Sequence, residues 1–176
     1  MKTLIGLTGR TGSGKSSAAQ IFERLGAFIA DCDKIAHETL QSEYIKEKLA
    51  SAFTHKIFDE NGEINRKALG EIVFSDSAQL KKLNEIMHKA IVERCIELCQ
   101  SSGKDICVMD GSELEESGAD EKCDFIVVIT ADEDKRLSRI MLRDNIDLES
   151  ARRRMNAQNE YSKKAIFIEN NGSRDS

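Results

Sequence analysis

The chain has 176 residues, 40% of them hydrophobic, with 31 acidic and 26 basic residues and a net charge of −5. This length and composition allow one sizeable core and exclude a fibrous repeat or a disordered chain. The acidic balance gives no overall positive field for nucleic acid or an anionic membrane, and no apolar run is long enough to span a bilayer. We therefore expect a single domain, residues 1–176, in a cytoplasmic protein that binds neither nucleic acid nor membrane.

Five short runs are nearly continuous in apolar residues, which is typical of strands covered on both faces. Segments with helical periodicity separate these runs, and strands that alternate with helices predict a parallel sheet flanked by helices in an α/β fold. The expected strands are Thr3–Thr8, Ala27–Asp31, Ile106–Asp110, Phe125–Thr130 and Ala165–Glu169. The expected helices are Lys15–Leu25, Lys34–Leu40, Tyr44–Phe53, Arg66–Val73, Ser77–Gln100, Asp132–Arg143 and Asp147–Lys163.

The sequence between the second and third strands is too long for a simple crossover helix and is predicted to contain several helices. Asp76 is the expected N-cap of the long helix Ser77–Gln100, and Asn65 is the expected cap of the helix before it. A helix of ~24 residues reaches ~36 Å, which is longer than a crossover needs. The sequence therefore predicts a helical insertion over residues 43–100.

The five cysteines show no paired Cys-x-x-Cys spacing of the kind used for zinc or a redox dithiol. We interpret them as buried thiols in a reducing compartment. Cys95 and Cys99 lie four residues apart in a helical stretch, so we expect them to share a core-facing stripe, and a metal role has little support from their spacing.

A glycine-rich loop follows the first strand directly. Residues Gly9 to Ser16 match G-x-x-x-x-G-K-[ST] in full and lie between a strand and a helix. In such a loop the backbone N–H groups surround phosphate oxygens, Lys15 reaches the β- and γ-phosphates, and Ser16 offers its hydroxyl to Mg²⁺. The alternative is a glycine-rich turn with an exposed lysine. We expect ATP and Mg²⁺ here, with Gly12, Ser13, Gly14, Lys15, Ser16 and Ser17 as the binding residues and Ser16 as the metal ligand.

Three carboxylates follow the second and third strands. Asp31 and Asp33 end the second strand, and Asp110 ends the third. Ligands in open α/β sheets bind at the carboxyl ends of strands, where Mg²⁺ or an acceptor hydroxyl would need these groups. The alternatives are that Asp33 caps the helix that begins at Lys34 and that Asp110 forms a turn. We expect Asp31 to be a structural neighbour.

Arginines recur at helical spacing near the end of the chain. A mobile segment that carries arginines can cover a phosphoryl-transfer site and offset charge on the moving group. The alternative is a solvated helix whose arginines pair with nearby acids, and we expect this for most of them but not all. The arginines are Arg136, Arg139, Arg143 and Arg152–Arg154, and the acids are Asp132, Glu133 and Glu149.

Motifs along nearly the whole chain point to one family: IGLTGRTGSGKS, LGAFIADCDKIAHE, NGEINRKALGEIVF, LKKLNEIMHKAIVE, CDFIVVITADEDKRLSRIMLRDN, RRRMNAQN and IFIENNGS. With them the chain resembles the dephospho-CoA kinase family. The resemblance implies a P-loop NTPase fold with a five-stranded parallel sheet, a helical acceptor-binding insertion over residues 43–100 and a lid at about residues 140–156. It implies transfer of the γ-phosphoryl of ATP to the ribose 3′-hydroxyl of dephospho-CoA, the last step of CoA synthesis.

The resemblance also implies roles for particular residues. By position, Asp33 is the catalytic aspartate, Arg143 the lid arginine and His88 the histidine of the acceptor-side helix. Asn170, Asn171 and Gly172 fall where the family passes the adenine of ATP. We therefore expect Lys15, Asp33 and Arg143 to be catalytic, Asp33, His88 and Asp110 to bind the acceptor, and Asn171 and Gly172 to bind ATP.

The chain departs from the family pattern at several positions. Arg10 replaces a second glycine, Lys89 replaces a proline, and DGSELEE at residues 110–116 replaces a stretch that contains Pro-Leu-Leu. A changed acceptor loop leaves two alternatives: a kinase of another small nucleotide-like acceptor, or a non-catalytic nucleotide-binding regulator. The resemblance also implies a further helix after the NGS loop, where this sequence stops at Ser176, so we expect the fifth strand to lack that cover and the chain to self-associate.

Overall fold

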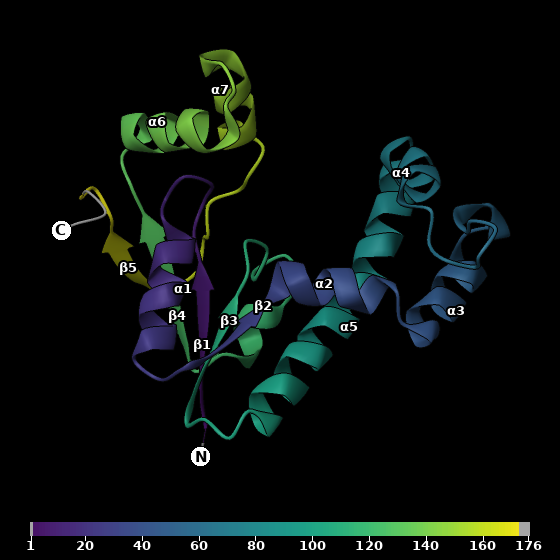
Figure 1. Ribbon diagram of the computed structural model, residues 1–176, viewed down its shortest axis with the longest axis horizontal. Coiled ribbons are helices and arrows are strands. Elements are labelled where there is room, and N and C mark those ends of the chain that lie inside the picture. The colour runs from purple at the N-terminus through teal and green to yellow at the C-terminus, as the bar shows by residue number, and fades with distance from the viewer. Residues whose placement is uncertain (1, 173–176) are drawn as a thin grey trace. The chain divides into compact units, whose positions relative to one another are not determined.

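The computed structural model describes residues 2–172 and contains one five-stranded sheet in the order β2-β3-β1-β4-β5 (Figure 1). β1 pairs in parallel with β3 and with β4, and β4 pairs in parallel with β5. The predicted five-stranded parallel sheet is confirmed. The strands are β1 (Thr3–Thr8), β2 (Phe28–Asp31), β3 (Ile106–Asp110), β4 (Phe125–Thr130) and β5 (Ile166–Glu169).

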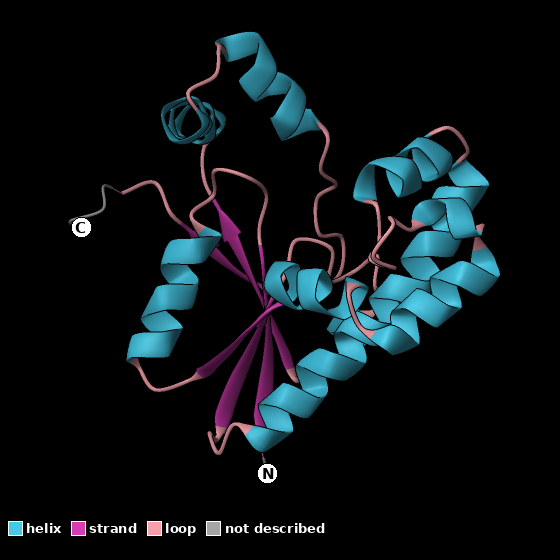
Figure 2. Ribbon diagram, turned by 45° about the vertical axis from the view of Figure 1, so that its right-hand side comes forward, coloured by secondary structure: helices cyan, strands magenta, loops and turns pink. Residues whose placement is uncertain are grey.

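Helix α1 (Lys15–Arg24) follows the glycine-rich loop and contacts β1 and β3. Figure 2 shows the strands fanning out as one twisted sheet. Apolar side chains from α1 and from the strands form a core cluster, which fixes the carboxyl end of β1 and hence the start of the loop. The buried members of this cluster are Leu7, Ala19, Ala27, Val108, Val127 and Ile129.

The chain folds as two compact units: the described parts of Met1–Ala30 and Ser102–Ser176 form one, and Asp31–Ser101 forms the other. The second unit is helical and has its own apolar core, which includes Ile45, Leu49, Ile57 and Met87. Its elements are α2 (Cys32–Leu40), α3 (Glu43–Ala52), η1 (His55–Ile57), α4 (Arg66–Phe74) and α5 (Ser77–Ser101). On α5, Cys95 and Cys99 are both buried, as their spacing predicts.

Side-chain caps define where the helices of the second unit begin. The predicted cap Asn65 accepts a hydrogen bond from the Ala68 N–H at 3.1 Å. Helix α2 begins at Cys32 instead of Lys34, and its cap is Asp31, which accepts from the Lys34 N–H at 3.0 Å. The interpretation of Asp33 as a cap is therefore wrong, because the helix begins two residues earlier than that role requires and places Asp33 in its first turn.

The segment after β4 forms two shorter helices, α6 (Glu133–Asp144) and α7 (Leu148–Asn156). They share a small core that contains Leu137, Ile140, Ala151 and Met155. The predicted helix Asp147–Lys163 is too long at its carboxyl end. Tertiary hydrogen bonds use the backbone and side chains of residues 158–163, and such contacts override local helix preference.

Candidate active site

The glycine-rich loop has backbone geometry that requires glycine at two positions. Gly12 and Gly14 have φ angles of +79° and +96°, in the left-handed region. A Cβ atom at Gly12 would lie 2.7 Å from the Arg136 carbonyl oxygen, and one at Gly14 would clash with the Asn170 side chain. The motif glycines therefore provide both the curvature of the loop and its close approach to α6 and to the end of β5.

Lys15 and Asp110 form an ion pair at the base of the loop. The register of the sheet places Leu7 of β1 opposite Asp110 of β3, so the carboxyl ends of both strands meet beside the loop. Both side chains are mostly buried, at 18% and 11% exposure. The structure therefore brings together two predicted site residues, and Asp110 does more than form a turn.

Arg139 of α6 holds the loop through its backbone. One terminal nitrogen donates to the Gly12 carbonyl at 3.2 Å, and the other donates to the Asn170 and Gly172 carbonyls at 2.9 and 3.0 Å. The Asn170 amide also donates to the Ser13 carbonyl at 2.9 Å. The planar fork of an arginine suits several acceptors at once, so α6, the loop and the segment after β5 form one polar assembly.

Arg136 is buried beneath the same loop, with 7% of its surface exposed. Its Nε donates to the Thr11 carbonyl at 3.0 Å. Burial, followed by the nearby charge of Arg10, lowers the pKa of the Arg136 guanidinium. The solvated-helix interpretation is therefore wrong for Arg136 and Arg139, whereas Arg153 does pair on the surface with Glu149 at 3.2 Å.

Arg143 lies at the carboxyl end of α6 and also reaches the loop. Its Nη2 donates to the Thr11 hydroxyl at 3.4 Å and to Asp144 at 2.9 Å. The hydrogen bond with Asp144 raises the pKa of Arg143 and lowers that of Asp144 to about 2. Its charged head is thus kept beside the loop by a carboxylate on the next residue.

Arg10 and the segment after α7 make contacts that the sequence analysis missed. Arg10 donates to Glu160 at 2.6 Å and to the Met155 carbonyl at 2.7 Å. The Thr11 N–H donates to the Gln158 side chain at 2.6 Å. Each of these bonds joins residues that are 145 or more positions apart, so no local pattern could predict them. The available signal was the charged Arg10 at a motif position that tolerates any residue.

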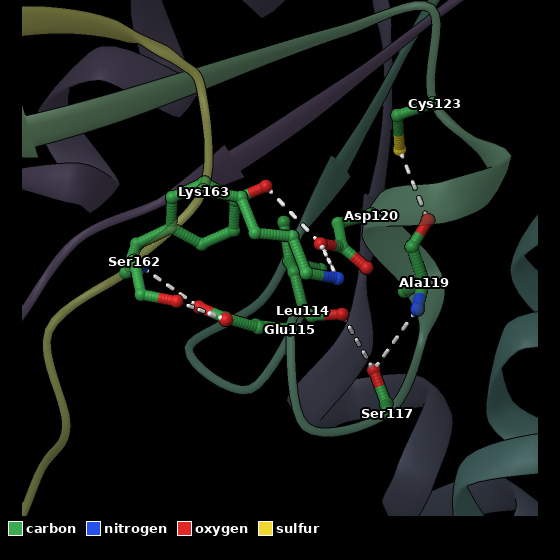
Figure 3. A network of polar contacts seen from close by, with 9 residues as sticks. Leu114, Glu115, Ser117, Ala119, Asp120, Cys123, Ser162 and Lys163 are labelled. Atoms are coloured by element: carbon green, nitrogen blue, oxygen red, sulfur yellow. Dashed lines mark hydrogen bonds and ion pairs between the residues drawn. The ribbon is translucent and has the colours of Figure 1, made fainter.

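Residues 157–165, the return segment between α7 and β5, are joined to the loop after β3 by a network of polar contacts (Figure 3). Glu115 accepts hydrogen bonds from both the backbone and the hydroxyl of Ser162, which lowers its pKa. Asp120, in the short helix η2 (Ala119–Lys122), accepts from Lys163 at 2.7 Å and from the Tyr161 hydroxyl at 3.1 Å. Burial and then Asp120 raise the pKa of Tyr161 to about 12.

A cavity of about 220 Å³ lies between this network and the glycine-rich loop. It is bounded by the loop itself, by residues 112–116 and by the return segment after α7. Its lining includes Arg10, Ser13, Ser112, Glu160, Tyr161 and Phe167. The altered stretch at residues 110–116 therefore forms part of the wall of a cavity next to the loop.

The comparisons with known proteins agree on one family. The family model described as dephospho-CoA kinase matches residues 3–175. This chain belongs to the dephospho-CoA kinase family. A dephospho-CoA kinase from Fusobacterium nucleatum is 39% identical over 172 residues, covering 96% of this chain and 89% of the relative. One from Geobacter sulfurreducens is 37% identical over 178 residues, covering 96% and 90%.

Solved structures show the same relationship. A crystal structure from Thermus thermophilus superposes with a TM-score of 0.80 at 27% identity, covering 98% of this chain and 90% of that one. A dephospho-CoA kinase from Campylobacter jejuni gives a TM-score of 0.66 at 28% identity, covering 99% and 91%. The resemblance of the motifs to the dephospho-CoA kinase family is confirmed.

Two of the three residues expected to bind the acceptor, Asp33 and His88, lie in the second unit. Asp33 is exposed in the first turn of α2, and His88 is half-buried on α5. Because Asp31 supplies the cap, no capping bond occupies the Asp33 carboxylate. The roles of both residues stay predictions.

The other residues expected to bind ATP or Mg²⁺ lie in the glycine-rich loop, at the start of α1 and after β5. Ser13 is buried, whereas Ser16 and Ser17 are exposed at the start of α1. The Asn171 side chain accepts from the Asp132 N–H at 2.8 Å, and Gly172 accepts from Arg139. Within residues 2–172, no group of three or more His, Cys, Asp or Glu side chains could hold a metal ion, and no helix is long and apolar enough to cross a membrane.

Proposed function

We propose that this protein transfers the γ-phosphoryl group of ATP to the ribose 3′-hydroxyl of dephospho-CoA, giving CoA and ADP as the last step of CoA synthesis. The observation that carries the proposal is the glycine-rich loop with its Lys15–Asp110 pair, in a chain that belongs to the dephospho-CoA kinase family. The loop points to a bound nucleotide, and the family points to a phosphotransferase with an alcohol acceptor.

On the nucleotide side, Gly12, Ser13, Gly14 and Lys15 hold the phosphates of ATP. Glycine fits this role at both positions because the backbone there is left-handed and a Cβ would collide with Arg136 or with the Asn170 side chain. Lys15 and Arg143 supply positive charge as negative charge shifts onto the transferring group and the leaving ADP oxygen. Asn171 and Gly172 hold the adenine end, and Ser17 completes the first turn of α1.

Ser16 is the residue that would hold Mg²⁺ with the phosphates. Its hydroxyl is exposed at the start of α1, and hydroxyl oxygen suits this hard cation. When bound, Mg²⁺ neutralises charge on the phosphate oxygens. Mg²⁺ in such sites usually keeps several waters and is bound by one or two protein oxygens together with substrate phosphates, so most other ligands would be phosphate oxygens and water.

On the acceptor side, Asp33 receives the proton of the ribose hydroxyl. A hydroxyl is a weak nucleophile, and a carboxylate at hydrogen-bond distance orients it and takes its proton as the oxygen–phosphorus bond forms. The bond between the γ-phosphorus and the bridging oxygen of ADP breaks in the same transfer. His88 and Asp110 bind the acceptor, within an acceptor-binding insertion at residues 43–100 and beside the loop, respectively.

Two further assignments complete the proposal. Residues 140–156, which hold the end of α6 and all of α7, act as a lid that brings Arg143 to the phosphates. The protein acts in the cytoplasm, and two copies of the chain associate through their edge strands β5. On this strand Ile166, Phe167 and Ile168 are 46% to 58% exposed. A molar mass by light scattering that stays monomeric at every concentration would exclude this pairing.

Two aspartates that lie two residues apart allow a matched test of the catalytic assignment. Asp33→Asn keeps the shape of the side chain but removes the proton acceptor, so kcat should fall by about 100-fold or more. Asp31→Asn is the control, because asparagine caps a helix about as well as aspartate. ADP release is measured with dephospho-CoA, adenosine and nucleoside monophosphates as acceptors, together with ATP affinity.

The outcomes separate the alternatives. Turnover with dephospho-CoA that is lost in Asp33→Asn and kept in Asp31→Asn supports the proposal. Preferred turnover of another acceptor points to the altered stretch at residues 110–116 and a different kinase. ATP binding without turnover of any acceptor indicates a regulator, and equal kcat in both variants removes Asp33 as the base.

A further inference from the structure

Two cysteines of the helical unit lie in contact although 63 residues separate them in sequence. The Sγ atoms of Cys32 on α2 and Cys95 on α5 are 3.8 Å apart, and α2 and α5 pack directly against each other. None of the five cysteines, all of which lie within residues 2–172, forms a disulfide. The sequence holds no Cys-x-x-Cys motif, and the interpretation of the cysteines as buried thiols is wrong for Cys32, which is partly exposed and meets Cys95 only through the fold.

The two sulfurs differ in their exposure to solvent and in the charges near them. Cys95 is fully buried, whereas Cys32 is partly exposed. Cys32 is the first residue of α2, directly after the cap Asp31, where the helix N-terminus favours negative charge. The hydrogen bond between the two sulfurs lowers the pKa of the Cys95 thiol, although burial and the Asp31 carboxylate act in the opposite direction. An accessible sulfur therefore shares a thiol proton with a buried one.

We propose that Cys32 and Cys95 form a reversible disulfide when the protein meets hydrogen peroxide. The Cys32 thiolate attacks one peroxide oxygen, the O–O bond breaks, and Cys32 becomes a sulfenic acid as hydroxide leaves. The Cys95 sulfur then attacks the Cys32 sulfur, the S–O bond breaks, and water leaves with the thiol proton. In total, two thiols lose two electrons and two protons, and one peroxide becomes two waters.

The position of Cys32 gives this disulfide a consequence for the reaction, and this step rests on the proposed function. Cys32 precedes Asp33, the proposed proton acceptor, in the first turn of α2. A disulfide is about 2.0 Å long, so closing the 3.8 Å gap draws the start of α2 toward α5. A displacement of about 1 Å at a catalytic group can cost roughly 100-fold in rate, and we expect kcat to fall at least about tenfold on oxidation.

The bond itself is tested without reference to activity. Reduced protein is treated with hydrogen peroxide, its thiols are counted, and peptides are mapped by mass spectrometry without reductant. We expect the loss of two thiols, a Cys32–Cys95 linked peptide and full recovery with dithiothreitol. Cys32→Ser and Cys95→Ser should each abolish the link, and Cys123→Ser, a half-buried cysteine of the other unit, should keep it. Peroxide that converts Cys32 to a sulfinic acid while Cys95 stays a thiol overturns the proposal.

Activity is then measured on the same samples. A fall in dephospho-CoA phosphorylation that dithiothreitol reverses, and that Cys32→Ser does not show, supports the effect on Asp33. A mapped disulfide with unchanged kcat overturns that effect. If the reduced protein phosphorylates no acceptor, the proposed function fails, while the thiol count and the peptide map still decide whether the disulfide forms.

Discussion

The two units of the chain hold their proposed site residues in different ways. In the unit with the sheet, charged side chains of α6 bond to the backbone of the glycine-rich loop, as Arg139 does at Gly12 and Arg136 at Thr11. In the helical unit, an apolar cluster holds the helices, and Asp33 lies exposed on a helix surface. Polar contacts thus hold the glycine-rich loop in its conformation. In the helical unit, the position of Asp33 depends on how the helices pack through their apolar faces.

This difference has a physical reason. A loop that must present backbone N–H groups to phosphate leaves its carbonyl groups needing partners elsewhere, and buried carbonyls without partners are costly. The arginines of α6 and the Asn170 amide supply those partners. A helix satisfies its own backbone, so a catalytic side chain on it needs only a well-packed opposite face. Substitutions should therefore affect the two units in different ways.

The largest expected effect comes from Lys15→Ala. Lys15 is the side-chain charge that the loop motif places on the β- and γ-phosphates, and loss of such a group costs about 100- to 1,000-fold in kcat. The variant also leaves Asp110 without its ion-pair partner, so thermal unfolding is measured alongside ADP release. Lys135→Ala, an exposed lysine of α6, is the control and should change kcat less than about twofold. A near-parental rate in Lys15→Ala, with the fold intact, would mean that the loop does not bind ATP for transfer.

A smaller effect is expected from Arg139→Lys, which tests whether polar contacts fix the loop. Lysine keeps the charge but cannot replace a fork that bonds to carbonyls of Gly12, Asn170 and Gly172. We expect the KM for ATP to rise about tenfold, from the loss of one or two hydrogen bonds of about 1 kcal/mol each, while the KM for dephospho-CoA changes little. Arg153→Lys, on the surface of α7, is the matched control. Equal changes in both KM values would show that the loop and the acceptor side are not held separately.

The sequence predicted those parts of the molecule that local chemistry determines. The loop motif, the ends of the strands and the Asn65 cap depend on neighbouring residues, and the register of the sheet then brings Asp110 to Lys15. It offered Asp33 as a possible cap and missed Asp31, because either carboxylate can cap a helix and the residue at which α2 begins decides which one does. The hydrogen bonds of Arg139 to the loop and the contact of Cys32 with Cys95 depend on packing between segments far apart in the sequence. No local sequence pattern predicts such packing.

The smallest expected effect concerns the pH dependence of the α6–α7 pair, which carries Arg143. Asp144 bonds to Arg143 at 2.8 and 2.9 Å and forms an ion pair with Arg154, and the Arg143 bond is the main reason that its pKa falls to about 2. A carboxyl with a lower pKa in the folded state stabilises that state fully above its unfolded pKa of about 4, and this stabilisation disappears as pH falls through about 2. Asp144→Asn should therefore lower the Tm at pH 7 by a few degrees, and its difference from the parent should shrink between pH 4 and pH 2. Asp105→Asn, an exposed aspartate before β3, is the control. A difference that stays constant down to pH 2 would show that Asp144 acts through packing and not through its charge, so its ion pair would not be what holds Arg143 beside the loop.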